Sequence, residues 1–326
     1  MMKLPRRRFL RLAAGAVALP AVSGVAQTQT YPTRPVRIIT GFAASGTPDI
    51  LARLLGQWLS ERLGQAFVVE NRPGAGGNIA TELVVRAPAD GYTLLLVGPN
   101  SAINATLYDK LNFNFIRDIA PIASISREPN IMLVNPSVPA KTIPEFIAYA
   151  KANPGKLNLA SGGSGTEPHM AGELFKMMAG VNLVHVPYRG GGPALTDLLG
   201  GQVQVMFPGP ASSIAYIRAG SLRALAVTSA PRLEALAEVP IMSDFLPGYE
   251  ASSWQGLVAP KNTPVEIVDM LNTAINAGLA DPTTRARLAD LGNQVLASSP
   301  AEFGKLIAEE TEKWGKVIRH AGIKAN

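Results

Sequence analysis

Short apolar runs alternate along this chain with longer segments whose apolar residues recur at helical spacing. Nine runs of four to seven residues are predicted strands, and most precede a predicted helix. This alternation predicts α/β layering with mainly parallel sheets, whose loops at the carboxyl ends of the strands collect ligands. The predicted strands cover residues 36–40, 67–70, 93–97, 131–134, 157–160, 183–186, 203–207, 222–228 and 256–259.

The length and composition predict two self-sufficient domains. The chain has 326 residues, of which 47% are hydrophobic, enough for about two domains with apolar cores of their own. It contains no cysteine, which excludes disulfides, thiolate nucleophiles and iron–sulfur clusters. No two of its three histidines lie within five residues of each other, so no local pair of metal ligands is predicted. We expect neither a metal nor a cofactor.

The first 26 residues have the features of an export signal. Five basic residues and no acidic ones lie at positions 3, 6, 7, 8 and 11, and the apolar segment that follows ends at Gly24-Val25-Ala26. A charged start, a short apolar segment and a small-residue cleavage site characterise a secretory signal peptide. The run Arg6-Arg7-Arg8-Phe9-Leu10-Arg11 is similar to a twin-arginine signal, with an arginine-rich Sec signal as the alternative. We expect cleavage after Ala26 and a periplasmic location.

The charge balance changes once this leader is removed. The full chain has a net charge of +6, but the remaining 300 residues carry 25 basic and 24 acidic side chains, a net charge of +1. A nearly neutral chain lacks the electrostatic footprint that nucleic-acid binding requires. No later apolar run reaches the roughly 18 residues needed to span a bilayer. The mature chain is therefore expected to be soluble and not to bind nucleic acid.

Two passages about 125 residues apart share one pattern. In each, an apolar run ends at a proline and a Thr-x-x-Glu capping box then begins a helix: Thr142 with Glu145, and Thr263 with Glu266. Equivalent exits from two strands indicate a chain that leaves one lobe and later returns to it. We therefore predict one lobe from residues 31–130 plus 255–326 and another from 131–254. Two sequential domains with an accidental resemblance remain the alternative.

The first predicted strand leads into a loop of small residues, 41–49, and then into a helix. Its small side chains let a ligand approach the backbone, and the positive end of the following helix favours an anion. The phosphate-loop pattern and its lysine are missing, so a carboxylate fits better than a phosphate chain. An ordinary strand-to-helix turn is the alternative. Asp49, in the first helical turn, either contacts a ligand donor or stabilises the helix dipole.

A second such loop covers residues 161–169. It offers three glycines and three hydroxyl groups directly before another helix. Thr166 replaces the second glycine of the Gly-x-Ser-x-Gly nucleophile motif, so a serine hydrolase is a weak alternative, with His169 as the base for Ser161 or Ser164. Otherwise His169 orients the loop or is a polar residue at a helix start.

A third loop, 186–193, contributes Tyr188, which can stack or donate a hydrogen bond, and Arg189, which can neutralise a carboxylate. The alternative is an exposed turn with a solvated arginine. The glycine-rich segment 71–78 lacks the full Gly-x-Gly-x-x-Gly spacing, so nucleotide binding there is only weakly supported.

Six segments together resemble one known family. They are Tyr31-Pro32-x-Arg34-Pro35-Val36, the loop and helix start from Phe42 to Arg53, Glu70-Asn71-Arg72-Pro73-Gly74-Ala75-Gly76-Gly77, Asp90-Gly91-Tyr92-Thr93-Leu94, Pro187-Tyr188-Arg189-Gly190-Gly191 and Gly220-x-Leu222-Arg223-Ala224-Leu225-Ala226-Val227. The chain from Tyr31 to Gly322 resembles the extracytoplasmic receptors of tripartite tricarboxylate transporters, also called the Bug family.

This resemblance implies a type II periplasmic-binding-protein fold, with two α/β lobes joined by two crossovers and a ligand cleft between them. A small carboxylate would be held in the cleft by loops 42–49 and 161–166, partly through water. The chain reads Ala44-Ser45-Gly46 where the family usually has Ala-Gly-Gly, so Ser45 places a side chain where the backbone often contacts the ligand.

The expected function is to capture a small organic carboxylate and deliver it, without catalysis, to the membrane subunits of a tripartite transporter. We expect the receptor to act as a monomer. A periplasmic sensor for a signalling system and a Ser/His esterase are the rival functions. The predicted ligand-binding residues are Phe42, Ala44, Ser45, Gly46, Thr47, Asp49, Ser161, Gly163, Ser164, Gly165, Thr166, His169, Tyr188 and Arg189.

Overall fold

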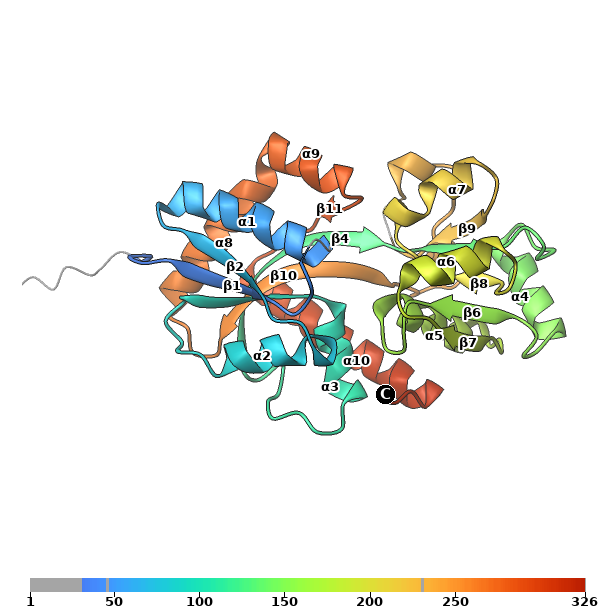
Figure 1. The fold of residues 1–326 in the computed structure, drawn as a ribbon, viewed down its shortest axis with the longest axis horizontal. Helices are drawn as coiled ribbons and strands as arrows, with labels where there is room; N and C mark the ends of the chain where they lie inside the picture. The colour runs from blue at the N-terminus through green and yellow to red at the C-terminus, as the bar shows by residue number, and fades with distance from the viewer. Residues whose placement is uncertain (1–30, 45–46, 230–231, 326) are drawn as a thin grey trace, which may run out of the picture.

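The computed structural model describes residues 31–44, 47–229 and 232–325, which form two α/β lobes side by side along the long axis of the molecule (Figure 1). The predicted leader and the predicted ligand residues Ser45 and Gly46 lie outside the described residues. The described strands are β1 (Val36–Thr40), β2 (Phe67–Asn71), β3 (Thr93–Val97), β4 (Ile119–Pro129), β5 (Ile131–Val134), β6 (Asn158–Ser161), β7 (Val184–Pro187), β8 (Val205–Met206), β9 (Arg223–Val227), β10 (Ser252–Pro260) and β11 (Gln294–Val295).

Each lobe is built on one sheet with helices on its faces. Among the described residues, the six-stranded sheet of the first lobe has the order β11-β4-β10-β3-β1-β2, and the five-stranded sheet of the second has the order β7-β6-β8-β5-β9. The helices are α1 (Thr47–Leu63), α2 (Asn78–Val85), α3 (Pro99–Leu107), α4 (Ile143–Ala152), α5 (Glu167–Ala179), α6 (Gly191–Leu199), α7 (Ile214–Arg218), α8 (Val265–Ala280), α9 (Pro282–Asp290) and α10 (Pro300–Ala321), with a short 3-10 helix η1 (Ala75–Gly77) before α2.

Strand β3 shows how the first lobe buries both faces of its sheet. Because successive strand residues point to opposite faces, Leu94 and Leu96 join the apolar cluster under α1 and α8. Leu95 and Val97 join the cluster on the other face, which contains residues of α2, α3 and α10. A strand buried on both faces reads as a continuous apolar run, which is why this strand could be located from the sequence.

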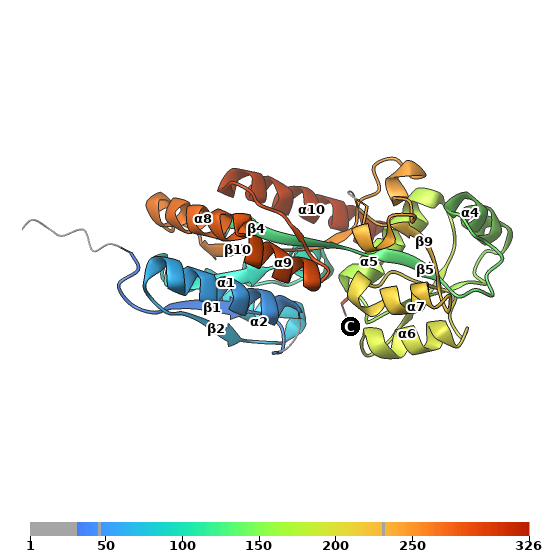
Figure 2. The ribbon, with the colours of Figure 1, turned by 90° about the horizontal axis from the view of Figure 1, so that it is seen from above.

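Two crossovers join the lobes. Strand β4 runs toward the second lobe and continues as β5 with only Asn130 between them, and the chain returns after β9 into β10 (Figure 2). The crossovers are bonded to each other, because Asn130 N donates to Thr228 Oγ1 (2.8 Å) and Thr228 N donates to the Asn130 carbonyl (2.9 Å). Helix α10 packs against α3 of the first lobe and α5 of the second.

The predicted strands all overlap observed ones, and most strands of each sheet run in the same direction, as expected, but each sheet also contains antiparallel pairs. Strand β10 pairs antiparallel with both β3 and β4, and β5 pairs antiparallel with both β8 and β9. The crossovers cause this: the chain leaves the first lobe along β4 and re-enters it along the adjacent β10 in the opposite direction. Strands β4 and β11 were missed, because Pro121, Ser124, Ser126 and Arg127 interrupt the apolar pattern of β4 and β11 has only two residues.

One of the two predicted capping boxes is present in part. The Thr142 side chain accepts a hydrogen bond from Glu145 N (3.3 Å), and Glu145 Oε2 accepts from Lys141 N (2.8 Å) rather than from Thr142 N. The box at Thr263 was wrong, because Thr263 Oγ1 donates to the Pro260 carbonyl (2.7 Å) and α8 begins two residues later. A complete capping box lies instead at the start of α10, between Ser299 and Glu302.

Within the part of the chain that the structure describes, none of the helices has both the length and the hydropathy of a bilayer-spanning segment. The same described residues contain no group of three or more His, Cys, Asp or Glu side chains arranged to hold a metal ion.

Candidate ligand-binding loops

The described predicted ligand residues of the first lobe lie in the loop after β1 (Phe42 and Ala44) and in the first turn of α1 (Thr47 and Asp49). This loop packs against the loop after β2, since a Cβ atom on Gly41 would lie 2.7 Å from the Gly77 Cα. Glycine at position 41 therefore permits the two backbones to approach. Phe42 is half-buried, while Ala44 and Thr47 are exposed. In Figure 1 the first turn of α1 lies at the side of its lobe that faces the second lobe.

Asp49 is the polar centre of this loop. Its carboxylate is buried and accepts hydrogen bonds from Arg53 Nε (3.1 Å), Arg53 Nη2 (2.9 Å) and Asn71 Nδ2 (2.9 Å). Asn71 Nδ2 also donates to the Phe42 carbonyl (3.0 Å). The carboxylate therefore fixes the loop through Asn71, a positioning role that was neither of the two alternatives for Asp49.

The predicted ligand residues of the second lobe come together from two loops. The parallel pairing of β6 and β7 continues into these loops, because Tyr188 N donates to the Ser161 carbonyl (2.9 Å) and Gly190 N donates to the Gly162 carbonyl (3.1 Å). A Cβ atom on Gly162 would lie 3.0 Å from Gly191 N. The loops 161–166 and 188–191 therefore form one surface.

Loop 161–166 has a backbone that only glycine adopts easily. Gly163 has φ +144° and Gly165 has φ +74°, both in the region that L side chains rarely adopt. Thr166 Oγ1 donates to the Gly163 carbonyl (2.8 Å), so its hydroxyl hydrogen is used inside the loop. Helix α5 begins directly after Thr166, and the N–H groups of its first turn have no partner within the helix.

Two histidines lie beneath this loop. The rings of His169 and His185 are stacked, with centroids 3.6 Å apart and 12° between their planes. His185 Nε2 lies 2.7 Å from Ser161 Oγ, and Gly165 N donates to His169 Nδ1 (3.0 Å). The hydrolase hypothesis paired Ser161 or Ser164 with His169, whereas the structure pairs Ser161 with His185 and buries the Ser161 side chain.

Tyr188 and Arg189 differ in how their polar groups are used. The Tyr188 hydroxyl donates to Asp197 Oδ2 (2.6 Å), and this bond raises the pKa of Tyr188 to about 12. The hydroxyl hydrogen of Tyr188 is therefore already used in a hydrogen bond within the second lobe. Arg189 is exposed and makes no ion pair with any other described residue.

Several residues that shape these loops were not predicted from the sequence: Asn71, Asn78, Asn104, Asn130 and His185. Asn104 Nδ2 donates to the Gly76 carbonyl and to Asn78 Oδ1, both at 3.0 Å. Asn78 Nδ2 and Thr40 Oγ1 are buried with no hydrogen-bond partner among the described residues, which is unusual for buried polar atoms. For Asn71 and Asn78 the only signal in the sequence was the glycine-rich segment 71–78, which contains both.

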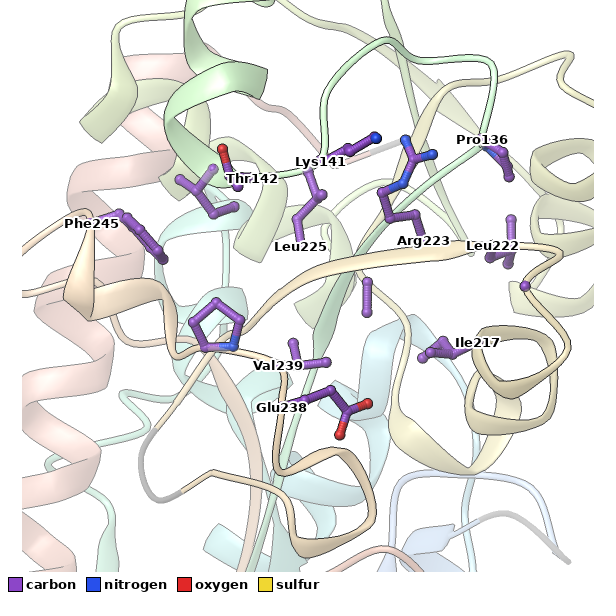
Figure 3. Close-up of a pocket in the computed structure, with 14 residues that line it drawn as sticks. Pro136, Lys141, Thr142, Ile217, Leu222, Arg223, Leu225, Glu238, Val239 and Phe245 are labelled. Carbon is purple, nitrogen blue, oxygen red and sulfur yellow. The ribbon is translucent and has the colours of Figure 1, made fainter.

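A cavity of about 440 Å³ lies elsewhere on the second lobe, and none of the predicted ligand residues lines it (Figure 3). Lys141, Arg223, Glu238 and Phe245 are among the side chains around it. Arg223 Nη1 donates to the carbonyls of Val138 (3.1 Å) and Ala140 (2.9 Å), so this guanidinium also supports the wall of the cavity.

Comparison with known proteins gives a consistent result. The model of the tripartite tricarboxylate transporter family receptor matches residues 51–323. The chain is 33% identical over 320 residues to the protein BugT of Bordetella pertussis, covering 97% of this chain and 98% of BugT. It is 37% identical over 324 residues to a UPF0065 protein from the tcbD-tcbE intergenic region of Pseudomonas sp. strain P51, covering 98% of this chain and 96% of that protein.

Two solved structures are similar to this chain over nearly their whole length. The structure of R. palustris Rpa4515 with adipate is 37% identical, with a TM-score of 0.76, and the match covers 90% of this chain and 99% of that one. MatC from Rhodopseudomonas palustris with bound malate is 32% identical, with a TM-score of 0.72, and the match covers 88% and 100% of the two chains.

Proposed function

The chain belongs to the tripartite tricarboxylate transporter receptor family, and from this membership we propose that it binds a small organic carboxylate between its lobes and delivers it to the membrane subunits of a tripartite transporter. Members of this family are periplasmic receptors, a role that involves no catalysis. Two similar proteins have structures with adipate and with bound malate, and both of these ligands are dicarboxylates. For this chain we propose the broader class of small organic carboxylates and no single ligand.

The observation that carries the proposal is a pair of small-residue loops, one in each lobe, that both lead into a helix N-terminus. Loop 41–46 precedes α1 and loop 161–166 precedes α5. The unpaired N–H groups and positive end of each helix favour an anion, and glycines let that anion approach the backbone. Arg189 adds a cation beside the second loop. We propose that the ligand carboxylate binds between these loops, in a site built from the fourteen residues predicted above. Some of them contact the ligand or its water, and others, such as Asp49 and His169, position the loops.

The proposal includes lobe limits of 31–130 plus 255–326 and 131–254, with closure of the lobes about the two crossovers. It also includes export by the predicted leader, through the twin-arginine pathway, and cleavage after Ala26. The mature receptor is proposed to act as a monomer. Delivery to a transporter is favoured over a sensor role by the family, whose description names the transporter.

A thermal-shift screen of the mature chain over a carboxylate library tests the ligand class. Adipate, malate, succinate, citrate and benzoate are the first probes, and the matching amides, alcohols and inorganic phosphate are the controls. A carboxylate at 100 times its Kd should add about 2.7 kcal/mol to the free energy of unfolding. Stabilisation by phosphate or by the neutral analogues, with none by any carboxylate, would contradict the proposal.

A further inference from the structure

The loop 161–166 needs an external support for its shape. Three of its six residues are glycine, the residue that loses the most conformational freedom when it is ordered. A loop that is already ordered before the ligand arrives avoids this loss during binding. Thr166 Oγ1 donates to the Gly163 carbonyl within the loop, and the backbone N–H groups of Tyr188 and Gly190 support its first two residues, Ser161 and Gly162.

The stacked rings of His169 and His185 supply that support from outside. His185, in β7, bonds the first residue of the loop through Ser161 Oγ (2.7 Å). His169, in the first turn of α5, bonds Gly165 near the other end of the loop through its backbone N–H (3.0 Å). Because the two rings are stacked on each other, both ends of the loop are bonded to one rigid pair.

The hydrogen bonds fix the tautomer of His169. Its Nδ1 accepts from Gly165 N–H, so the hydrogen of the neutral ring is on Nε2, which lies 3.5 Å from Glu173 Oε1. Glu173 Oε1 also accepts from Lys176 Nζ (2.8 Å). A carboxylate behind a histidine sets the orientation of its ring, as in many sites where a histidine must present one particular nitrogen.

We propose that His169 and His185 are positioning residues that hold loop 161–166 in its ligand-binding shape, an inference that rests on the proposed function. Neither imidazole needs to touch the ligand. The buried His169 ring acts through the Gly165 amide and the His185 ring acts through Ser161. His169 thereby has the loop-orienting role that was one alternative from the sequence.

Amide side chains test the geometry, because each can replace only one ring nitrogen. In His169→Asn the Oδ1 atom takes the place of Nδ1 and can accept from Gly165, whereas in His169→Gln the polar atoms take the place of Nε2. In His185→Gln the amide reaches the position of Nε2 beside Ser161, whereas in His185→Asn it does not. Each pair compares a variant that restores the bond with one of similar polarity that does not.

Affinity is measured by calorimetry with the five carboxylates adipate, malate, succinate, citrate and benzoate. For any that bind the wild type, we expect His169→Gln and His185→Asn to raise the Kd by about 2- to 13-fold, corresponding to one lost hydrogen bond. The matched variants His169→Asn and His185→Gln should stay close to the wild-type Kd. Equal Kd values within each pair would overturn the inference. Should one variant fail to fold by circular dichroism, the pair of variants at the other histidine decides the comparison by the same criterion.

A second measurement needs no ligand. Hydrogen exchange of the Gly165 amide should be slow in the wild type and in His169→Asn, and faster in His169→Gln, while the 15N shift of wild-type His169 Nδ1 should be that of an unprotonated nitrogen. Unchanged Gly165 exchange in His169→Gln would overturn the inference. If none of the carboxylates binds the wild type, the proposed ligand class fails, and this exchange measurement still decides whether the histidines hold the loop.

Discussion

Asn130 donates its side-chain amide nitrogen to both carboxylate oxygens of Glu167, at 2.8 and 2.7 Å. Asn130 is the single residue between β4 and β5, and Glu167 is the first residue of α5, directly after the proposed ligand loop. A crossover between the lobes is thus bonded to the helix that follows the loop. Burial raises the pKa of Glu167 to about 7, although the bond from Asn130 lowers it.

Replacing Asn130 by Ala should destabilise the protein, because it leaves the buried Glu167 carboxyl group without this donor. Loss of a hydrogen bond to a charged group corresponds to about 1.5–3 kcal/mol in the free energy of unfolding. Urea unfolding at pH 8 gives this value. Asn153→Ala is the control, since Asn153 Nδ2 donates to a helix carbonyl of Tyr149, outside the crossovers. Equal stability of the two variants would contradict the prediction.

The pKa of Glu167 predicts a loss of stability with rising pH. The folded pKa of about 7 lies above the ordinary value of 4.5, so the folded state retains a proton that the unfolded state releases. Stability from this group is present below pH 4.5 and is lost as the pH rises through 7. In Glu167→Gln the decrease in unfolding free energy between pH 5 and 8 should be smaller than in the wild type. Some decrease remains in the variant, because burial also raises the pKa of Glu128 to about 7. If the unfolding free energy of Glu167→Gln fell with pH as steeply as that of the wild type, Glu167 would not titrate in this range.

The pKa of His185 predicts the opposite trend in acid. Burial and the adjacent His169 ring lower its pKa to about 4, below the ordinary value of 6.5. Between these values the unfolded state binds a proton that the folded state does not, so stability is lost as the pH falls from 6.5 to 4. His185→Gln, which cannot titrate, should lose less unfolding free energy over this interval. Parallel pH profiles for the variant and the wild type would count against a neutral His185.

Asn71 should be a principal support of the first ligand loop. Asn71→Ala removes the donor shared by the Phe42 carbonyl and the Asp49 carboxylate. We expect the free energy of unfolding to fall by about 1.5–3 kcal/mol, because one acceptor is charged and buried. Gln57→Ala, which removes an exposed bond to Glu61 on α1, is the control and should change stability by at most about 0.5 kcal/mol. A loss in the control as large as in Asn71→Ala would refute the special role of Asn71.

Ester hydrolysis should be absent. The Ser161 side chain is buried and its Oγ lies 3.0 Å from the Gly163 carbonyl, so a substrate carbonyl cannot reach it without opening the loop. We expect the wild type and Ser161→Ala to release p-nitrophenol from p-nitrophenyl acetate at the same background rate. Turnover that depends on Ser161 would favour the esterase instead.

The sequence was sufficient for features that depend on neighbouring residues. Apolar runs located nine strands, including β3, because a strand buried on both faces needs no partner to be recognised. The glycine-rich loops before α1 and α5 could also be located, because small residues between a strand and a helix form a local pattern. The lobe limits and the ligand contacts stay predictions.

Contacts between distant residues were decided by the tertiary structure. Strand β4 has a mixed polar and apolar sequence and is a strand because it lies between β10 and β11. The parallel register that sets Leu159 opposite His185 brings that histidine to Ser161, a partner 24 residues away that no spacing rule predicted. Asn130 and Glu167, 37 residues apart, likewise meet only because the crossover packs against the start of α5. Local propensity determines which segments form strands, helices and turns, whereas the pairing of buried polar groups depends on how those segments pack.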